Sequence, residues 1–475
     1  MSYRHLLAAA VLLNGSLLAV GYALLATPLR GRSPLAWISY CGVALLVGAS
    51  TVGVVLCGLA VAGLRIDLTV FGVVAVLLVA LGVAAAFALP PATRDRVAPA
   101  SSGRLSSATP LGSVVAAAAG AAVVAVGVLL LASAFRSSPT LDDVWGFWLP
   151  KGIALGRLGL DPGLFLPGGA YQPFDHLDYP LWWSIVLGLS ARLTGSLDLR
   201  IVDVELGVLV VAMLAAAARL LASRIRPAVL WPCLLLISVS PELHRQVLGG
   251  GADLALAVYL ALFVLCGALW LAEGGLFELA LAVVFGAAAV QIKTEGAPQL
   301  LLFAAVLSLA GWKVGRRRQL GLWGGVALAF ASALPFLAWR QEHGLRNDIS
   351  LRHALDPSFL AGRTERVAPA ARALGHQLVN PHDWFLVVPA VLLLGVIGAL
   401  RHRRMLWLAP AALVGVGYAF WIWANWGDTM NLRFRLETSA YRIVDATVLA
   451  AAFAVPFLVD RLLPGRPVTR GAEDG

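Results

Sequence analysis

The sequence predicts an all-α polytopic membrane protein with about thirteen transmembrane helices, and two observations lead to this fold class. Of the 475 residues, 60% are hydrophobic and only 13% are charged. A soluble protein of this length carries roughly 25% charged residues, because its surface must face water. Apolar runs of about 18 residues or more, long enough to cross a bilayer, recur along the whole chain. The lipid bilayer is therefore the first partner that the sequence predicts.

The boundaries of the spans follow from the length of each apolar run and from the arginine and lysine residues between runs. The first run, Leu6 to Leu25, lacks a small-residue cleavage site, so we interpret it as a span and not as a signal peptide. The stretches 227–240 and 276–311 are short, and the predicted count depends most on them. In chain order the predicted spans are 4–26, 35–62, 68–90, 112–136, 199–222, 227–240, 252–272, 276–292, 296–311, 319–338, 384–400, 405–423 and 442–460.

Basic residues between the spans predict the orientation. They gather in alternate connections that are poor in acids, and the positive-inside rule places these connections in the cytoplasm. The N-terminus then lies outside and the C-terminus inside. The same pattern explains the net charge of +10 without nucleic acid, for which the chain has no recognition motif. The residues are Arg30, Arg32, Arg94, Arg96, Arg104, Arg219, Arg224, Arg226, Lys313, Arg316, Arg317, Arg318, Arg401, Arg403, Arg404, Arg461, Arg466 and Arg470.

The connections on the opposite side contain most of the Asp, His, Trp and Tyr residues outside the spans. Polar connections of this kind commonly carry the function of a protein, so we expect the chemistry on this outer side. The alternative is that they only cover helix ends, which suits 339–383, where charges mix without a pattern. The outer connections are 137–198, 241–252, 339–383 and 424–441.

The first large outer connection begins with two adjacent carboxylates, Asp142 and Asp143, which follow an apolar span directly. Carboxylates are costly beside a closed cavity in a membrane and are then usually functional. Trp145 and Trp148 follow, and an aromatic belt at the interface is an equally good interpretation of them. Further on, Ser184–Leu193 is an amphipathic stretch too short to span, which predicts a helix lying in the interface.

Other candidate residues lie at the mouths of later spans. Asp253 follows three glycines and is either a helix N-cap or part of a site. Lys293 and Glu295 lie between two spans, where a simple local ion pair is the alternative. The four cysteines, at 41, 57, 233 and 266, sit inside apolar runs without metal-ligand spacing, so we interpret them as packing residues.

Taken in order, these residues resemble the GT-C superfamily of membrane glycosyltransferases, in the branch of protein O-mannosyltransferases and lipid A aminoarabinose transferase. The resemblance covers about residues 112–450. It leaves 1–111 as additional N-terminal transmembrane helices, 112–462 as the GT-C-like domain and 463–475 as a cytoplasmic tail. The matching features are Asp142-Asp143 after a span, Asp178-Tyr179-Pro180-Leu181 before the interfacial helix, Asp253 heading a span, Lys293-Thr294-Glu295-Gly296 in a turn, and Thr438-Ser439-Ala440-Tyr441-Arg442 heading the last span.

The resemblance implies transfer of a sugar from a polyprenyl-phosphate donor to a protein, polysaccharide or glycolipid acceptor outside the membrane. It implies an inverting mechanism in which Asp142 or Asp143 is the general base; the spacing to Gly159 favours Asp143. Many relatives have Asp-Glu where this chain has Asp-Asp. Neither a metal nor another cofactor is expected. The residues expected to bind the substrate, with the cations near the leaving phosphate, are Asp253, Lys293, Arg245, Tyr179, His176, Arg442 and Glu295.

A transporter or flippase is the rival interpretation of the same sequence. Transporters often consist of two matching halves and carry charges near the middle of the bilayer. This chain has no evident internal repeat, and its candidate charges lie at span ends on one side. A composition rich in Ala, Gly, Arg and Val suggests a GC-rich bacterial source, so we expect the bacterial plasma membrane.

Overall fold

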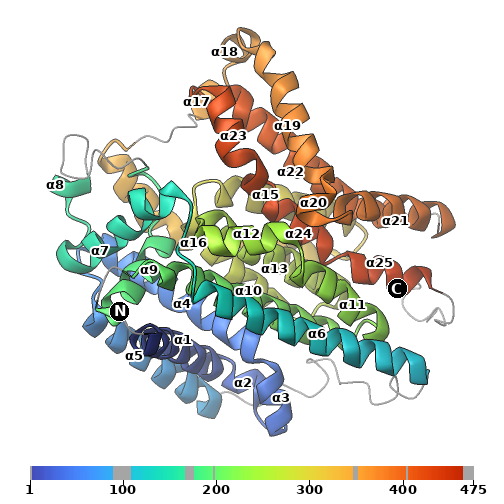
Figure 1. The fold of residues 1–475 in the computed structure, drawn as a ribbon, viewed down its shortest axis with the longest axis horizontal. Coiled ribbons are helices and arrows are strands. Elements are labelled where there is room, and N and C mark those ends of the chain that lie inside the picture. The colour runs from blue at the N-terminus through green and yellow to red at the C-terminus, as the bar shows by residue number, and fades with distance from the viewer. Residues whose placement is uncertain are drawn as a thin grey trace.

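A computed structural model describes residues 3–88, 109–165, 176–195, 198–345, 351–402 and 405–463. These residues form helices and no β-strand (Figure 1). Among them, nine helices are long and apolar enough to cross a membrane, or up to eleven if each of two bent pairs is one span. The all-α polytopic class is therefore confirmed, whereas the count of thirteen stays a prediction. Arg94, Arg96, Arg104, Arg403, Arg404 and the tail from residue 464 lie outside the described residues.

Every predicted span contains at least one helix. The long spanning helices are α1 (Tyr3–Leu24), α4 (Cys41–Val61), α5 (Leu68–Ala88), α6 (Pro110–Ala134), α10 (Arg200–Leu221), α13 (Ala252–Glu273), α16 (Arg316–Glu342), η5 with α22 (Met405–Leu408, Ala409–Gly427), and the run of α23 (Leu432–Ile443), α24 (Asp445–Ala452) and α25 (Val455–Leu462). The bent pairs are α11 (Pro227–Ser238) with α12 (Pro241–Gly249), and η4 (Thr364–Arg366), α19 (Val367–Val379) and α20 (Pro381–Trp384) with α21 (Val387–His402). The shorter helices are α2 (Ala26–Leu29), α3 (Pro34–Ser39), η3 (Val144–Trp148), α7 (Leu149–Leu158), α8 (Pro162–Phe165), α9 (Trp182–Thr194), α14 (Leu276–Ile292), α15 (Gly296–Ala310), α17 (Leu351–Ala354) and α18 (Pro357–Ala361).

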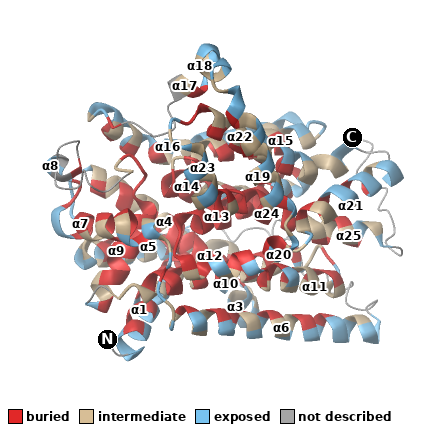
Figure 2. Ribbon diagram, turned by 45° about the horizontal axis from the view of Figure 1, so that its top comes forward, coloured by how far each residue is buried: buried red, intermediate tan, exposed pale blue. Residues whose placement is uncertain are grey.

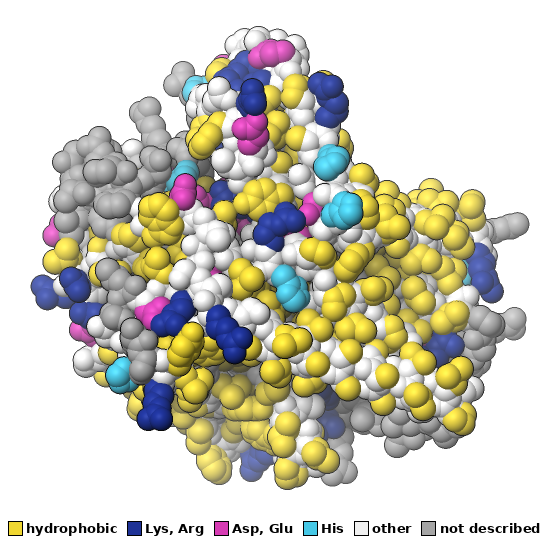
Figure 3. Space-filling model, in the orientation of Figure 1, with side chains coloured by type: hydrophobic (Ala, Val, Ile, Leu, Met, Phe, Trp, Pro, Cys, Tyr) yellow, Lys and Arg dark blue, Asp and Glu magenta, His cyan; other side chains and the backbone are white. Residues whose placement is uncertain are grey.

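Helix α13 forms the centre of the bundle. Of its most apolar 18-residue window, 94% is buried, against 17% for α5 at the periphery. Helices α14, α24, α15 and α10 surround α13, and buried residues concentrate there while α5 and α6 are exposed on one side (Figure 2). Apolar side chains cover the exposed face of α6 and α21, and charged side chains gather elsewhere (Figure 3). The exposed apolar helices are the surface that lipid would cover.

The N-terminal helices are part of this bundle and do not form a separate layer. Helix α4 packs against α1, α10, α14 and α9. Glycine makes the crossing of α1 and α4 close, because a Cβ atom on Gly21 would lie 1.7 Å from the Ala44 carbonyl oxygen. The same crossing brings Gly48 against Leu17, where a Cβ atom would lie 1.8 Å from the carbonyl oxygen. Small residues of this kind let helix backbones approach in membranes, where no hydrophobic force drives helices together.

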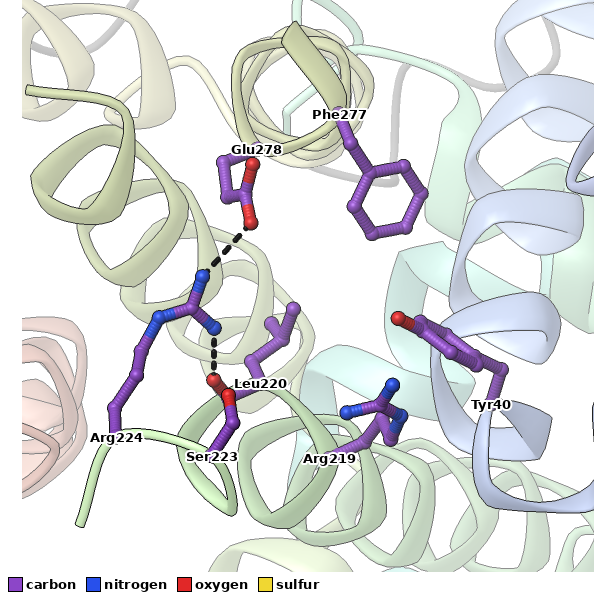
Figure 4. A pocket seen from close by; sticks show the side chains of 7 residues that line it. All are labelled: Tyr40, Arg219, Leu220, Ser223, Arg224, Phe277 and Glu278. Carbon is purple, nitrogen blue, oxygen red and sulfur yellow. Dashed lines mark hydrogen bonds and ion pairs between the residues drawn. The ribbon is translucent and has the colours of Figure 1, made fainter. Parts of the chain in front are cut away.

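Several basic residues that are predicted to be cytoplasmic lie at one end of the bundle among the described residues. Four of them, given below, contact another helix end there, which neutralises the charge or satisfies a terminal carbonyl. Figure 4 shows part of this end, with Arg224 beside Glu278 and Arg219 over the Tyr40 ring at 4.2 Å. The contacts are Arg224 with Glu273 and Glu278, Arg226 with Asp460, Arg318 with the carbonyls of Leu271 and Ala272, and Arg401 with the carbonyl of Leu462.

Two outer connections fold into helices that project from the bundle at the top of Figure 1. Helices α17, α18 and α19 lie against α22. The indole of Trp423 donates to the Ala354 carbonyl at 2.9 Å, and that of Trp426 to the Leu360 carbonyl at 2.8 Å. The stretch 339–383, whose charges show no pattern in the sequence, is thus largely helical and fastened by tryptophans.

The helix predicted at 184–193 forms as α9, but its surroundings differ from the prediction. Trp182 to Ala191 are all buried, so an amphipathic helix on the surface is wrong. The reason is a close crossing with α7, where a Cβ atom on Gly188 would lie 2.4 Å from the Gly152 carbonyl oxygen. Helices α7, α1 and α4 pack against α9, so no face of it is left for the interface.

The close crossing of α1 and α4 predicts an asymmetric effect of two alanine substitutions. We expect Gly21→Ala to lower the thermal unfolding temperature of the chain in nanodiscs, because the added methyl group overlaps the Ala44 backbone and overpacking costs about 1–3 kcal/mol. Gly15→Ala on the same helix is the control, since its Cβ atom would meet nothing within 4 Å. Equal unfolding temperatures for both variants would contradict this packing.

The two ends of the bundle should also differ in accessibility from outside the cell. Trp145 and Trp312 are 52% and 73% exposed at opposite ends. With Cys41 replaced by serine, Trp145→Cys should react with a membrane-impermeant maleimide in intact cells, and Trp312→Cys only after permeabilisation. The reverse labelling pattern would refute the predicted orientation.

Candidate functional site

The candidate site begins where α12 ends and α13 starts. Gly250 has a left-handed φ of 81°, a conformation that favours glycine. Its missing side chain leaves room for the first outer connection, because a Cβ atom there would lie 2.6 Å from Pro139 and 2.7 Å from Val144. The Leu141 amide also donates to the Gly249 carbonyl at 3.2 Å. The glycine run thus positions the segment that carries Asp143 against the start of α13.

Asp253 lies in the first turn of α13 and is not its N-cap, which is Gly251. Its Oδ1 accepts a hydrogen bond from Lys293 Nζ at 2.8 Å. Lys293 ends α14 in an extended conformation, and its Nζ lies 3.7 Å from Glu295 Oε1. Burial opposes the charged form, but Asp253 and Glu295 prevail and raise the pKa of Lys293. The local pair with Glu295 exists, yet the shorter contact is with Asp253, forty residues away.

Arg442 connects this pair to the first outer connection. Its Nη1 donates to Asp143 Oδ2 at 2.6 Å, and its Nε lies 3.6 Å from Asp253 Oδ2. Asp253 is thus held between two cations. We call Asp143, Arg442, Asp253, Lys293 and Glu295 the ion network. Asp143 is its most accessible member, with 32% of its side chain exposed, against 10% or less for the other four.

Asp142 and Asp143, which the sequence leaves as alternatives, have different surroundings. Asp143 joins the ion network. Asp142 is exposed and makes no ion pair or side-chain hydrogen bond with another described residue. Only one of the two adjacent carboxylates is therefore placed beside the cations.

Tyr179 contacts the ion network from the far end of the first outer connection. Its hydroxyl donates to Glu295 Oε1 at 3.2 Å, and Lys293 Nζ lies 5.6 Å from its ring centroid. His176 stacks on the Tyr179 ring at 4.4 Å and has a left-handed φ of 64°. Trp148 stacks on the same ring at 5.5 Å. His176 is therefore part of an aromatic stack and not a solvated loop residue.

Arg245 is the one predicted cation that stays outside the ion network. It pairs with Glu242 at 2.6 Å and with Asp383 at 2.8 Å, and its guanidinium lies 5.9 Å from the Tyr441 ring centroid. It thus lies near Tyr441, the neighbour of Arg442 in the sequence, but it pairs with two carboxylates that are not part of the ion network. Half of the Arg245 side chain is exposed, so Arg245 lies at the surface, at the rim of the candidate site.

The structure adds two residues that the sequence reasoning missed. Lys151 is only 1% exposed and donates to the carbonyls of Leu177 and Tyr179. Asp445, one turn after Arg442, is fully buried, and neither of its oxygens has a hydrogen-bond partner among the described residues. Each is a charged residue within an apolar or aromatic stretch, which is the signal that could have identified it.

The ion network is closed, because its cations and carboxylates contact one another directly. Two cavities of the described residues lie away from the network, one at the end drawn in Figure 4 and one of about 390 Å³ beside Tyr3 and Arg136. Among the described residues, no three His, Cys, Asp or Glu side chains are grouped to hold a metal ion.

The ion network can offer one accessible carboxylate for proton transfer and two cations for an anionic group.

Comparisons with protein-family models, with curated proteins and with solved structures find no match to this chain.

The Lys293–Asp253 pair predicts strong energetic coupling. Lys293→Met should lower the unfolding temperature, because removing one partner leaves the other charge buried and unpaired, which costs about 3–5 kcal/mol. Lys293→Met combined with Asp253→Asn should be less destabilised than the sum of the single variants. Thermal unfolding of all four chains in nanodiscs measures this coupling. Arg433→Gln is the control, since Arg433 is 87% exposed in its pair with Glu437; simple additivity of the two buried substitutions would contradict the pair.

Proposed function

We propose that this chain transfers a sugar from a polyprenyl-phosphate donor to an acceptor on the extracytoplasmic side of the membrane. One observation carries the proposal: five charged side chains, from four segments that are far apart in the sequence, converge into one ion network. These segments begin or end spans on the side opposite the basic connections. Charged residues buried at span ends are costly and are usually retained for function.

Asp143 is the general base in this proposal. The acceptor hydroxyl must lose a proton as it attacks the anomeric carbon, so a carboxylate has to reach it. The partial exposure of Asp143 supports this role, whereas Asp142 pairs with no cation among the described residues. A single displacement, which inverts the anomeric configuration, needs one base only, whereas a double displacement needs a second carboxylate as nucleophile.

Lys293 and Arg442 stabilise the charge of the departing lipid phosphate. Preformed cations in a site from which water is excluded are the strongest electrostatic contribution to such a reaction. Asp253 contacts both cations, so it fixes the distance between them. Tyr179 and Glu295 hold Lys293 from the other side, and His176 supports the Tyr179 ring. Arg245, at the rim, is available to the acceptor or to the lipid surface.

The donor phosphate has to open the ion network to bind. In the closed state Arg442 Nη1 donates to Asp143 Oδ2 at 2.6 Å, so this oxygen is not free to accept the proton of an acceptor hydroxyl. A phosphate that competes for Arg442 frees Asp143 for the acceptor. Binding of the donor thereby produces the base, which limits side reactions with water before the donor is bound.

The position of the network suits a donor that is dissolved in the bilayer. Polyprenyl chains stay among lipid tails, and their phosphate lies at the interface, where the spans end. The exposed apolar helices around the bundle allow such a lipid to approach from the side. The acceptor, a protein, polysaccharide or glycolipid, arrives from the aqueous side near the projecting helices. The compartment that fits this arrangement is the bacterial plasma membrane.

The proposal predicts different outcomes for two adjacent substitutions. In nanodiscs containing a polyprenyl-phosphate sugar, the chain should release polyprenyl phosphate, and Asp143→Asn should lower the rate by at least about 100-fold, as loss of a general base does. Asp142→Asn is the matched control and should keep most of the rate. Mass spectrometry of the extracted lipids measures the release.

Two results would argue against this function. Full turnover by Asp143→Asn would remove the proposed base. Movement of the intact lipid-linked sugar between leaflets without release of polyprenyl phosphate would favour the rival transporter or flippase.

A further inference from the structure

Lys151 is the most deeply buried lysine described, and it lies outside the ion network. It occupies the first turns of α7 and is 1% exposed. Its Nζ donates to the Tyr179 carbonyl at 2.6 Å and to the Leu177 carbonyl at 3.2 Å. A lysine ammonium has three donors and no acceptor, and two of them are used on one short stretch of backbone. Burial of an ammonium is costly unless it is hydrogen-bonded, so these two bonds fix the local geometry.

The stretch that Lys151 holds carries Tyr179 into the candidate site. The Tyr179 carbonyl accepts from Lys151, while the hydroxyl of the same residue donates to Glu295. The ring lies beside Lys293. One residue thus connects two buried lysines, one through its backbone and one through its side chain. A displacement of the Tyr179 backbone would move its ring away from Lys293.

A second contact fastens the same stretch from another helix. Asp178 is 3% exposed, and its Oδ2 lies 3.9 Å from Nη1 of Arg340 near the outer end of α16. The backbone on both sides of Asp178 is therefore held by α7, and its side chain faces α16. Helix α7 itself is fixed by its close crossing with α9 at Gly152, the residue after Lys151.

We propose that Lys151 is a positioning residue for the transferase site: by holding the backbone at Leu177 and Tyr179, it sets the Tyr179 ring and hydroxyl against Lys293 and Glu295. This inference rests on the proposed function. Lys151 does not touch the ion network, so it acts through Tyr179 and not on the reacting atoms.

The protonation of Lys151 gives the inference a pH signature. Burial lowers the pKa of Lys151 to about 8, although Asp178 and, more weakly, Cys57 of α4 oppose the shift. The ammonium is therefore charged below about pH 8 and neutral above it, so its charge-assisted hydrogen bonds, the stronger kind, weaken as the pH rises. Other charged groups on the elements around α7 lie further along it: Arg192 of α9 donates to the Gly156 carbonyl, and Arg65 lies against Gly159.

The experiment compares the full chain in nanodiscs with Lys151→Met, Lys151→Arg and the exposed control Lys313→Met. The rates of polyprenyl phosphate release, kcat and KM, are measured between about pH 6.5 and 9.5. We expect Lys151→Met to lower kcat at least about tenfold near neutral pH, because Tyr179 loses its anchor. The kcat of the wild type should fall as the pH rises through about 8. Lys151→Arg, which stays charged throughout this range, should restore part of kcat and remove that fall.

Hydrogen–deuterium exchange tests the same contact without activity. The amides of 177–181 should exchange faster in Lys151→Met than in the wild type, while those of α13 stay protected. If the wild type is inactive, the proposed function fails, and this arm alone reports whether Lys151 holds the segment. If the wild type is active, an unchanged kcat in Lys151→Met with unchanged exchange at 177–181 overturns the inference. If neither variant folds, a wild-type kcat that does not change as the pH passes through about 8 also overturns the inference.

Discussion

The ion pair between Lys293 and Asp253 is the interaction on which the rest of the candidate site depends. Both groups are more than nine-tenths buried at the ends of apolar helices, where an uncompensated charge is strongly unfavourable. The nearest opposite charge to each is the other, 2.8 Å away. Arg442 then approaches the second oxygen of Asp253, and Asp143 approaches Arg442. The contacts of the network therefore run from one buried ion pair, Lys293 and Asp253, to one accessible carboxylate, Asp143.

The ion network can therefore form only when the helices that carry its residues are packed together. Asp253 belongs to α13, which the other helices enclose, while Arg442 arrives from α23 at the far end of the chain. Asp143 is brought in only because the glycines before α13 leave space for its connection. No part of the network is local except Lys293 and Glu295. A disturbance of packing at any of these helix ends would leave a charge unpaired, so stability and function are difficult to separate here.

The sequence predicted those parts of the fold and site that depend on length and local spacing. The length of each apolar run predicted where a helix would form, because the thickness of the bilayer fixes the length of a span. Every predicted span contains a helix. Positions at span mouths identified Asp253, Lys293, Glu295 and Arg442 as candidates. The sequence did not separate Asp142 from Asp143, since adjacent residues differ only in which one faces Arg442. It also placed Arg245 with the other cations, although Glu242 and Asp383 hold it. The burial of α9 depends on packing against other helices such as α7, and the hydrophobic pattern of a single segment does not show which helices pack against it.

The charges of the ion network bear on how the proposed reaction could proceed in a site of low dielectric. A polyprenyl-phosphate sugar is a phosphodiester with one negative charge, and cleavage of its bond to the sugar leaves a phosphate monoester with two. During the same displacement the acceptor proton moves to Asp143, which loses its negative charge as the new bond to the anomeric carbon forms. One negative charge thus passes from the carboxylate to the phosphate, and the total stays constant. Arg442 contacts Asp143 in the closed state and, in the proposed reaction, has turned to the donor phosphate before the displacement, so it already lies beside the group that gains the charge. Because the charge on the phosphate grows during the displacement, a cation beside it stabilises the transition state more than the bound donor, which is what catalysis requires.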